Sequence, residues 1–194
     1  IIFLVLFNLV IYHVGICLET FIYPLVIVAL AITFSIDFRF QLIPDEVHIL
    51  LLLVGIIKLI FNFSFSWLIN CIGGALIGGG IFFLINIIAL LVLKKEGMGF
   101  GDIKLMTALG FVFGIKNILV ITLVSFVIGA IIGGIVLIVK RKESDGYIPF
   151  GPFIAIGTLI VMFFPADSII DIYINFCSWL GDRMTDCVYF FLER

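Results

Sequence analysis

One run of the sequence, residues 67–93, contains no charged side chain and is long enough to cross a lipid bilayer as a single helix. Similar apolar runs recur along the chain, of which 64% is hydrophobic and 12% is charged. A soluble domain is about half apolar and about a quarter charged. A membrane β-barrel would show segments of about ten residues with alternating hydrophobicity, whereas these runs are continuous. The sequence therefore predicts an all-α fold, a polytopic transmembrane helix bundle.

The order of the apolar runs predicts about seven spans within residues 1–165. The runs are residues 1–18, 21–36, 47–61, 67–93, 103–115, 117–139 and 153–164. The remaining residues, 166–194, mix Asp with Ile, Phe, Trp and Tyr. That mixture predicts a C-terminal amphipathic helix lying in the membrane interface, or a last span.

The basic residues predict which way the bundle is oriented. They gather in alternate connections between the expected spans, at Arg39, Lys94, Lys95 and residues 140–142. The two intervening connections, residues 62–66 and 115–117, hold just one basic residue, Lys116. Loops rich in Lys and Arg remain in the cytoplasm. We therefore expect Asp37, Asp102 and the segment "YIPFGPF" to lie together at the cytoplasmic membrane face.

Two carboxylates stand at the expected ends of spans. Asp37 lies in "FSIDFRFQLIPD", and Asp102 follows the glycines of "GMGFGDIK". Two facing carboxyl groups share one proton, because like charges that are close cannot both ionise easily. The ionised group can take a proton from water while the other donates one to a peptide carbonyl. The pair thus predicts aspartic-protease chemistry; the alternative is that Asp102 is a helix cap and Asp37 a charge at the membrane boundary.

The residues around the two aspartates have expected structural roles. The glycines of the loop would let the backbone adopt positive φ and approach a substrate or another helix closely. Asp45 follows Pro44 at the expected start of a helix, where it would act as a cap. Glu46 would favour the same helix start electrostatically.

Three motifs resemble those of the type IV prepilin peptidases, a family of bacterial membrane aspartic proteases. "GMGFGDIKLMTALGFVFG" is similar to the family's glycine-aspartate signature. "DFRFQLIPD" is similar to its other motif, an Asp followed after six residues by Pro and then Asp or Asn. "YIPFGPFIAIG" resembles the segment before the last span. Three matches in the family's order are a much stronger signal than one glycine-aspartate motif.

The resemblance implies roles for individual residues. Asp37 and Asp102 would be the catalytic pair of a peptidase bundle formed by residues 1–165. Lys104 belongs to the matched motif and would hold a phospholipid or a substrate carboxylate. The residues implied to shape the loop or to bind substrate are Gly97, Gly99, Gly101, Lys104, Pro44 and Asp45.

The resemblance also implies substrate, partners and location. The family removes the short basic leader of type IV prepilins or pseudopilins at the cytoplasmic face of the bacterial inner (plasma) membrane. The pathway would be pilus assembly, competence or type II secretion. The expected partners are these substrates and membrane lipid, with a homo-oligomer left open, and neither a cofactor nor a metal is expected. Nucleic acid is not expected, because the net charge is −2.

This sequence departs from the larger members of the family. They carry an extra first span and a cytoplasmic domain with paired C-x-x-C motifs, and they also N-methylate the new amino terminus from S-adenosylmethionine. No C-x-x-C occurs here. We therefore expect a short, protease-only version or an N-terminally truncated one, without methyltransferase activity.

Three other classes of protein remain open. A presenilin-like protease would carry a Tyr-Asp pair and a Pro-Ala-Leu segment, whereas here Asp37 follows Ile36 and no Pro-Ala-Leu occurs. A transporter or channel would use the two aspartates as proton or cation ligands and would have spans broken near the midplane. A catalytically silent assembly subunit would keep the fold but could lose either Asp.

Overall fold

The computed structural model describes residues 18–94, 97–139 and 149–192. All regular structure among these residues is helical, and it contains no strand, which confirms the predicted all-α class. The helices are α2 (Leu18–Phe40), α3 (Asp45–Phe61), α4 (Phe65–Leu93), α5 (Phe100–Val139), α6 (Gly151–Phe163) and α7 (Ala166–Leu192). The first expected span, residues 1–18, lies almost wholly outside the described residues.

The described residues fall into two compact units that divide between Phe163 and Phe164. The first unit holds α2 to α6. The second consists mainly of α7, a continuous helix of 27 residues on which acidic residues such as Asp171 alternate with exposed apolar side chains such as Ile172 and Trp179. The predicted boundary at residue 165 and the interfacial location of α7 remain predictions.

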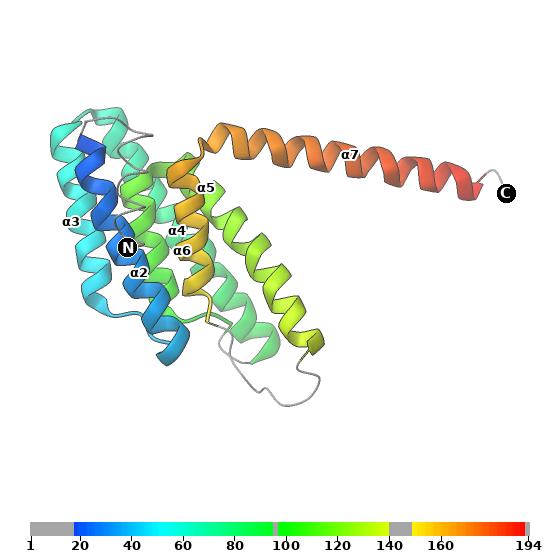
Figure 1. Cartoon of the computed structure of the whole chain (residues 1–194), viewed down its shortest axis with the longest axis horizontal. Coiled ribbons are helices and arrows are strands. Elements are labelled where there is room, and N and C mark those ends of the chain that lie inside the picture. Colours follow the sequence, from blue (N-terminus) through cyan, green and yellow to red (C-terminus); the bar gives the residue numbers. More distant parts are fainter. Residues whose placement is uncertain (1–17, 95–96, 140–148, 193–194) are drawn as a thin grey trace. The chain divides into compact units, whose positions relative to one another are not determined.

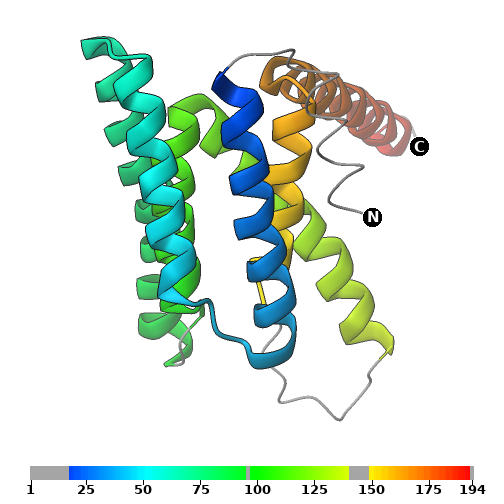
Figure 2. The same ribbon diagram turned by 60° about the vertical axis from the view of Figure 1, so that its left-hand side comes forward.

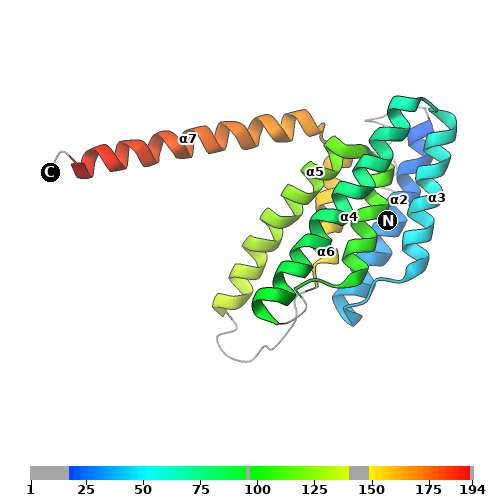
Figure 3. The same cartoon turned by 180° about the vertical axis from the view of Figure 1, so that it is seen from behind.

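Helices α2 to α6 pack side by side in the first unit (Figures 1 and 3). The most extensive helix–helix contact is between α4 and α5. It is close because glycines face each other: a Cβ added to Gly74 would collide with the backbone of Gly110 and Gly114. Gly78, four residues later, meets the backbone of Met106 in the same way. Small residues at this spacing allow apolar helices to approach closely in a membrane.

A sharp bend divides α5 into two legs. Gly114 has φ 78° and ψ 178°, a conformation that is essentially restricted to glycine. The backbone N–H of Ile115 donates to the Asn70 side-chain oxygen at 3.0 Å, so a partly buried amide that loses its helical partner at the bend is satisfied. Figure 2 shows the second leg returning from the bend, which lies opposite the end where α5 begins. The bend agrees with the separate runs predicted at residues 103–115 and 117–139.

Within the described part of the chain, three helices are long and apolar enough to cross a membrane, namely Glu19–Phe40, Phe65–Val92 and Phe100–Val136. A fourth is added if α6 and residues 166–179 are counted together as one span. Their outer surfaces carry exposed large apolar side chains such as Phe21, Leu76 and Leu91. Such surfaces are favourable against lipid and unfavourable against water. The chain is therefore a multi-pass membrane protein.

Candidate active site

Asp37 lies in the last turn of α2, where its side chain is buried. Its Oδ2 accepts a hydrogen bond of 2.9 Å from the backbone N–H of Gly151, the first residue of α6. The first amides of a helix have no partner within the helix and carry a partial positive charge, so they favour an ionised carboxylate. A Cβ at residue 151 would lie 2.5 Å from the same oxygen. A side chain at residue 151 would therefore displace the Asp37 carboxylate.

Asp102 lies in the first turn of α5 and is also buried. Its backbone N–H donates to the Gly99 carbonyl at 3.1 Å, which starts the helix at Phe100. Asp102 is thus the third residue of α5, so the alternative that it is the helix cap is wrong. Its Oδ1 is buried without a hydrogen-bond partner among the described residues. A buried carboxyl oxygen in this condition favours the protonated form of the group.

The two aspartates meet in one cavity, although 64 residues separate them in the sequence. The cavity has a volume of about 360 Å³, and the Asp37 and Asp102 carboxyls interact electrostatically across it. The other lining residues are Gln41, Leu42, Ile43, Asp45, Gly99, Phe100, Gly101 and Lys104. Of the residues predicted from sequence to form the site, Gly97 and Pro44 do not line this cavity.

The glycine loop is shaped by close packing and not by unusual backbone torsions. Asn86 of α4 accepts the backbone N–H of Gly97 at 3.2 Å through its side-chain oxygen, and a Cβ at residue 97 would collide with Ala89. A Cβ at Gly101 would lie 3.2 Å from the Cβ of Ile43. Among the described glycines, positive φ occurs at Gly114. The prediction of positive φ in the loop is therefore wrong, because the limiting factor there is space.

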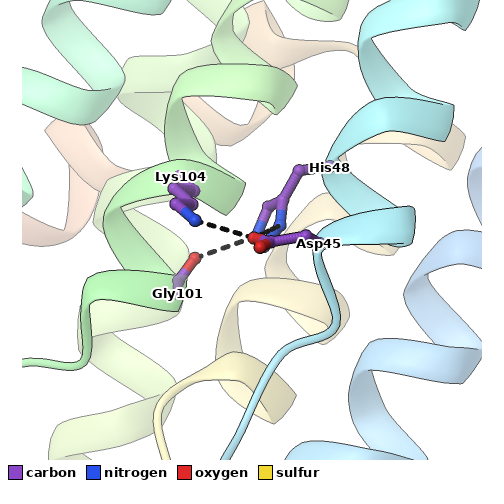
Figure 4. A network of polar contacts seen from close by, with 4 residues as sticks. All are labelled: Asp45, His48, Gly101 and Lys104. Atoms are coloured by element: carbon purple, nitrogen blue, oxygen red, sulfur yellow. Dashed lines mark hydrogen bonds and ion pairs between the residues drawn. The ribbon is translucent and has the colours of Figure 1, made fainter.

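A polar network joins the first turn of α3 to the first turn of α5 (Figure 4). The Lys104 ammonium donates to Oδ1 of Asp45 at 2.7 Å. Nε2 of His48 lies 3.1 Å from the Gly101 carbonyl oxygen, and Nδ1 of His48 lies 3.6 Å from Oδ1 of Asp45. The hydrogen bond from Lys104, and then the charge of Lys104, lower the pKa of Asp45 below its ordinary value of 3.8.

This network corrects the role predicted for Asp45. Pro44 occupies the N-cap position of α3 with φ −62° and ψ 141°, and no side chain caps the helix. Asp45 is the first residue of α3. Its carboxylate pairs with Lys104 and does not cap a backbone N–H at the start of the helix. The resemblance implies that Lys104 holds a phospholipid or a substrate carboxylate. In the structure its partner is the carboxylate of Asp45 in the same chain.

Sequence reasoning missed His48, Gly151 and Asn86 as residues that support the site. Asp45 and His48 are three residues apart and therefore lie on one helix face, and this spacing could have suggested His48. No local signal indicates that Gly151 contacts Asp37, 114 residues away. Within the described part of the chain, no three His, Cys, Asp or Glu side chains gather where they could hold a metal ion.

Comparison with known proteins places this site in a family. The model of the type IV leader peptidase family matches residues 24–134, more than half of the chain and inclusive of both aspartates. Curated relatives named prepilin leader peptidase/N-methyltransferase are 36% identical in Xanthomonas campestris pv. campestris, 37% in Legionella pneumophila and 35% in Bacillus subtilis (strain 168). The matches cover 74%, 85% and 83% of this chain, respectively.

The same matches cover 50%, 57% and 62% of the three relatives, so the chain spans somewhat more than half the length of such proteins. No solved structure matches the chain. The matched region contains all of α3 and α4 and most of α2 and α5. These helices carry Asp37, Asp102 and the network between α3 and α5. With more than half of its residues matched by the family model, this chain belongs to the type IV leader peptidase family.

Proposed function

We propose that the chain is a membrane-embedded aspartic endopeptidase that removes the short basic leader from type IV prepilins or pseudopilins. The observation that carries this proposal is the meeting of two buried carboxyls, Asp37 and Asp102, in one cavity. The names of the relatives supply the substrate class. Bacterial prepilins or pseudopilins and membrane lipid are its proposed partners.

The hydrogen bonds support different roles for the two aspartates. Asp37 accepts an amide N–H at a helix start and is therefore the ionised member, which takes a proton from the attacking water. Oδ1 of Asp102 is buried and has no hydrogen-bond partner among the residues that the structure describes, so Asp102 is the protonated member. It donates its proton to the oxygen of the scissile carbonyl while water oxygen bonds to the carbonyl carbon.

This step yields a neutral tetrahedral diol without a covalent enzyme intermediate. In the next step the carbon–nitrogen bond breaks. Asp37 returns its proton to the leaving amine nitrogen, while one diol hydroxyl gives its proton back to Asp102. Both carboxyls thereby recover their starting protonation states, so no cofactor is consumed.

Position along the helices favours a peptidase over a transporter. Asp37 lies in the last turn of α2 and Asp102 in the first turn of α5. A transporter would place its ionisable ligands near the membrane midplane, at interrupted helices. A prepilin is expected to present its scissile bond next to an apolar helix, and therefore at a membrane face.

We further propose about seven spans, with the site at the cytoplasmic face of the bacterial inner membrane. The count comprises α2, α3, α4, the two legs of α5 and α6, with the run expected at residues 1–18 as the first span. The basic residues Arg39, in the last turn of α2, and Lys94, the C-cap of α4, support this orientation, because each lies a few residues before cavity residues in the sequence.

Replacement of either aspartate tests the function. Asp37→Asn or Asp102→Asn should abolish cleavage, at least a hundredfold loss, because an amide cannot exchange the required proton (about 10²–10⁴-fold is typical of general acid–base groups). The measurement is the size shift of a co-expressed prepilin after loss of its leader. Asp171→Asn, an exposed change on α7, is the matched control and should cleave normally.

Membrane fractions of each variant should contain equal amounts of protein, so that a loss of cleavage is not a loss of insertion. Full cleavage by either site variant would rule out the two-aspartate mechanism.

A further inference from the structure

The His48 side chain is buried in the first turn of α3 and faces the backbone of α5 (Figure 4). Its Nε2 lies 3.1 Å from the carbonyl oxygen of Gly101. A carbonyl oxygen can accept a hydrogen bond but cannot donate one, so Nε2 must carry the proton. In neutral imidazole Nδ1 is then unprotonated; it is buried without a hydrogen-bond partner among the described residues, 3.6 Å from Oδ1 of Asp45.

The bonded carbonyl belongs to the peptide unit that joins Gly101 to Asp102. That unit is planar, so its carbonyl and its N–H are fixed together. The carbonyl accepts from His48 at 3.1 Å, and the N–H of Asp102 donates to Gly99 at 3.1 Å. The peptide unit that bears Asp102 is thus held on both sides, from α3 and from the glycine loop.

A second contact between the same helices lies on the other side of Asp102. Lys104 bonds to Asp45, which precedes His48 by three residues on α3. Asp45 and His48 therefore hold α5 at residues 104 and 101, and Asp102 lies between these two points. Gly101 also packs against Ile43, the residue that precedes Pro44. Rotation of the first turn of α5 would break all three contacts.

We propose that His48 is a positioning residue for cleavage: its Nε2–H holds the Gly101 carbonyl and so fixes the Asp102 carboxyl opposite Asp37. This inference rests on the proposed function, because it assigns a further residue to the site of Asp37 and Asp102. His48 does not touch the reacting atoms. Its contribution is to the geometry of the catalytic step, where a displacement of about 1 Å can reduce the rate by about a hundredfold.

Variants at position 48 separate a directed hydrogen bond from simple packing. His48→Gln carries an amide N–H at about the reach of Nε2, whereas His48→Asn carries the same amide one methylene shorter. We expect His48→Gln to keep kcat within a few-fold of the original. We expect His48→Asn and His48→Leu to lower kcat roughly ten- to a hundredfold with KM nearly unchanged.

The assay uses the purified full chain in detergent and a prepilin-type peptide with a basic leader ending in Gly. Leu51→Ala, a fully buried position one turn further along α3, is the control for general loss of packing. It should lower the melting temperature without changing kcat. Equal kcat values for His48→Gln and His48→Asn would overturn the proposal, even if His48→Leu does not fold.

The failure of this inference differs from the failure of the proposed function. If Asp102→Asn keeps its activity, the peptidase mechanism itself is wrong. If Asp102→Asn is inactive while His48→Asn has unaltered kcat, the mechanism stands and His48 has no positioning role.

Discussion

The hydrogen bond between Gly151 and Asp37 joins a catalytic candidate to the first residue of α6, within the segment that the sequence predicts to lie at the same membrane face. The amide of Gly151 is one of the donors at the start of α6 that cannot bond within the helix. Asp37 satisfies it and gains a partner that favours its charged form. In a low-dielectric surrounding, such a bond has a larger effect than it would in water.

Gly151→Ala should therefore reduce cleavage about tenfold or more, which corresponds to roughly 1.4 kcal/mol in the barrier. The new methyl group would lie 2.5 Å from the Asp37 oxygen and would push the carboxylate away from the amide. Rates of prepilin cleavage at equal protein levels measure the effect. Gly80→Ala is a matched control, because a Cβ there meets nothing within 4 Å. Unchanged cleavage by Gly151→Ala would show that the contact with Asp37 is not needed.

At the scale of elements, α3 and α5 are joined at their first turns by one ion pair and one hydrogen bond. The ion pair between Asp45 and Lys104 is partly solvent-exposed, and such pairs contribute little when they are fully hydrated. Its value here is geometric, since it holds the two helix starts in register. Helix packing elsewhere depends on apolar contacts and on the close approach of glycines in α4 and α5.

The stability of the fold should depend on pH through the ion pair between Asp45 of α3 and Lys104 of α5. Lys104 depresses the pKa of Asp45 in the folded chain, so the pair stabilises the fold above the ordinary Asp pKa of 3.8. This contribution falls as pH drops below that value and is lost once pH passes below the folded pKa. The Asp45→Asn variant should therefore have a slightly lower melting temperature than the original chain at pH 7. The difference in melting temperature should vanish in acid.

Thermal unfolding in detergent between pH 7 and pH 2 measures this difference, and Asp171→Asn serves as an exposed acidic control. A gap between Asp45→Asn and the original chain that stays constant across this range would contradict the assigned pair.

At the scale of the whole molecule, the ends of the bundle differ in chemistry. One end gathers the end of α2 and the starts of α3, α5 and α6 (Figure 2). The cavity that holds Asp37 and Asp102 lies at this end. The other end holds the α3–α4 connection and the bend of α5 at Gly114. Basic residues favour the first end as the cytoplasmic one.

Thiol labelling tests this orientation. In a version whose own cysteines are replaced by serine, Lys94→Cys lies at the cavity end and Phe63→Cys at the opposite end, and both positions are exposed. A membrane-impermeant maleimide added to intact cells should label Phe63→Cys alone. Both should react after permeabilisation. Labelling of Lys94→Cys in intact cells would place the site outside the cytoplasm.

Most of the helical layout could be predicted because hydrophobicity and charge are local properties of the sequence. The run at residues 47–61 corresponds to α3, and that at 153–164 to α6, each within two residues at its ends. Pro165 follows the end of α6 by two residues. The two runs on either side of residue 116 correspond to the legs of α5, although the bend itself lies at Gly114.

The sequence by itself determined the all-α class, the order of the apolar helices, the two aspartates and the resemblance that carries the family. The tertiary structure alone decided which groups meet: Gly151 with Asp37, His48 with Gly101, and Lys104 with Asp45. The reason is physical. A hydropathy pattern depends on residues a few positions apart, whereas these contacts depend on how each helix is rotated and how deep it lies against its neighbours.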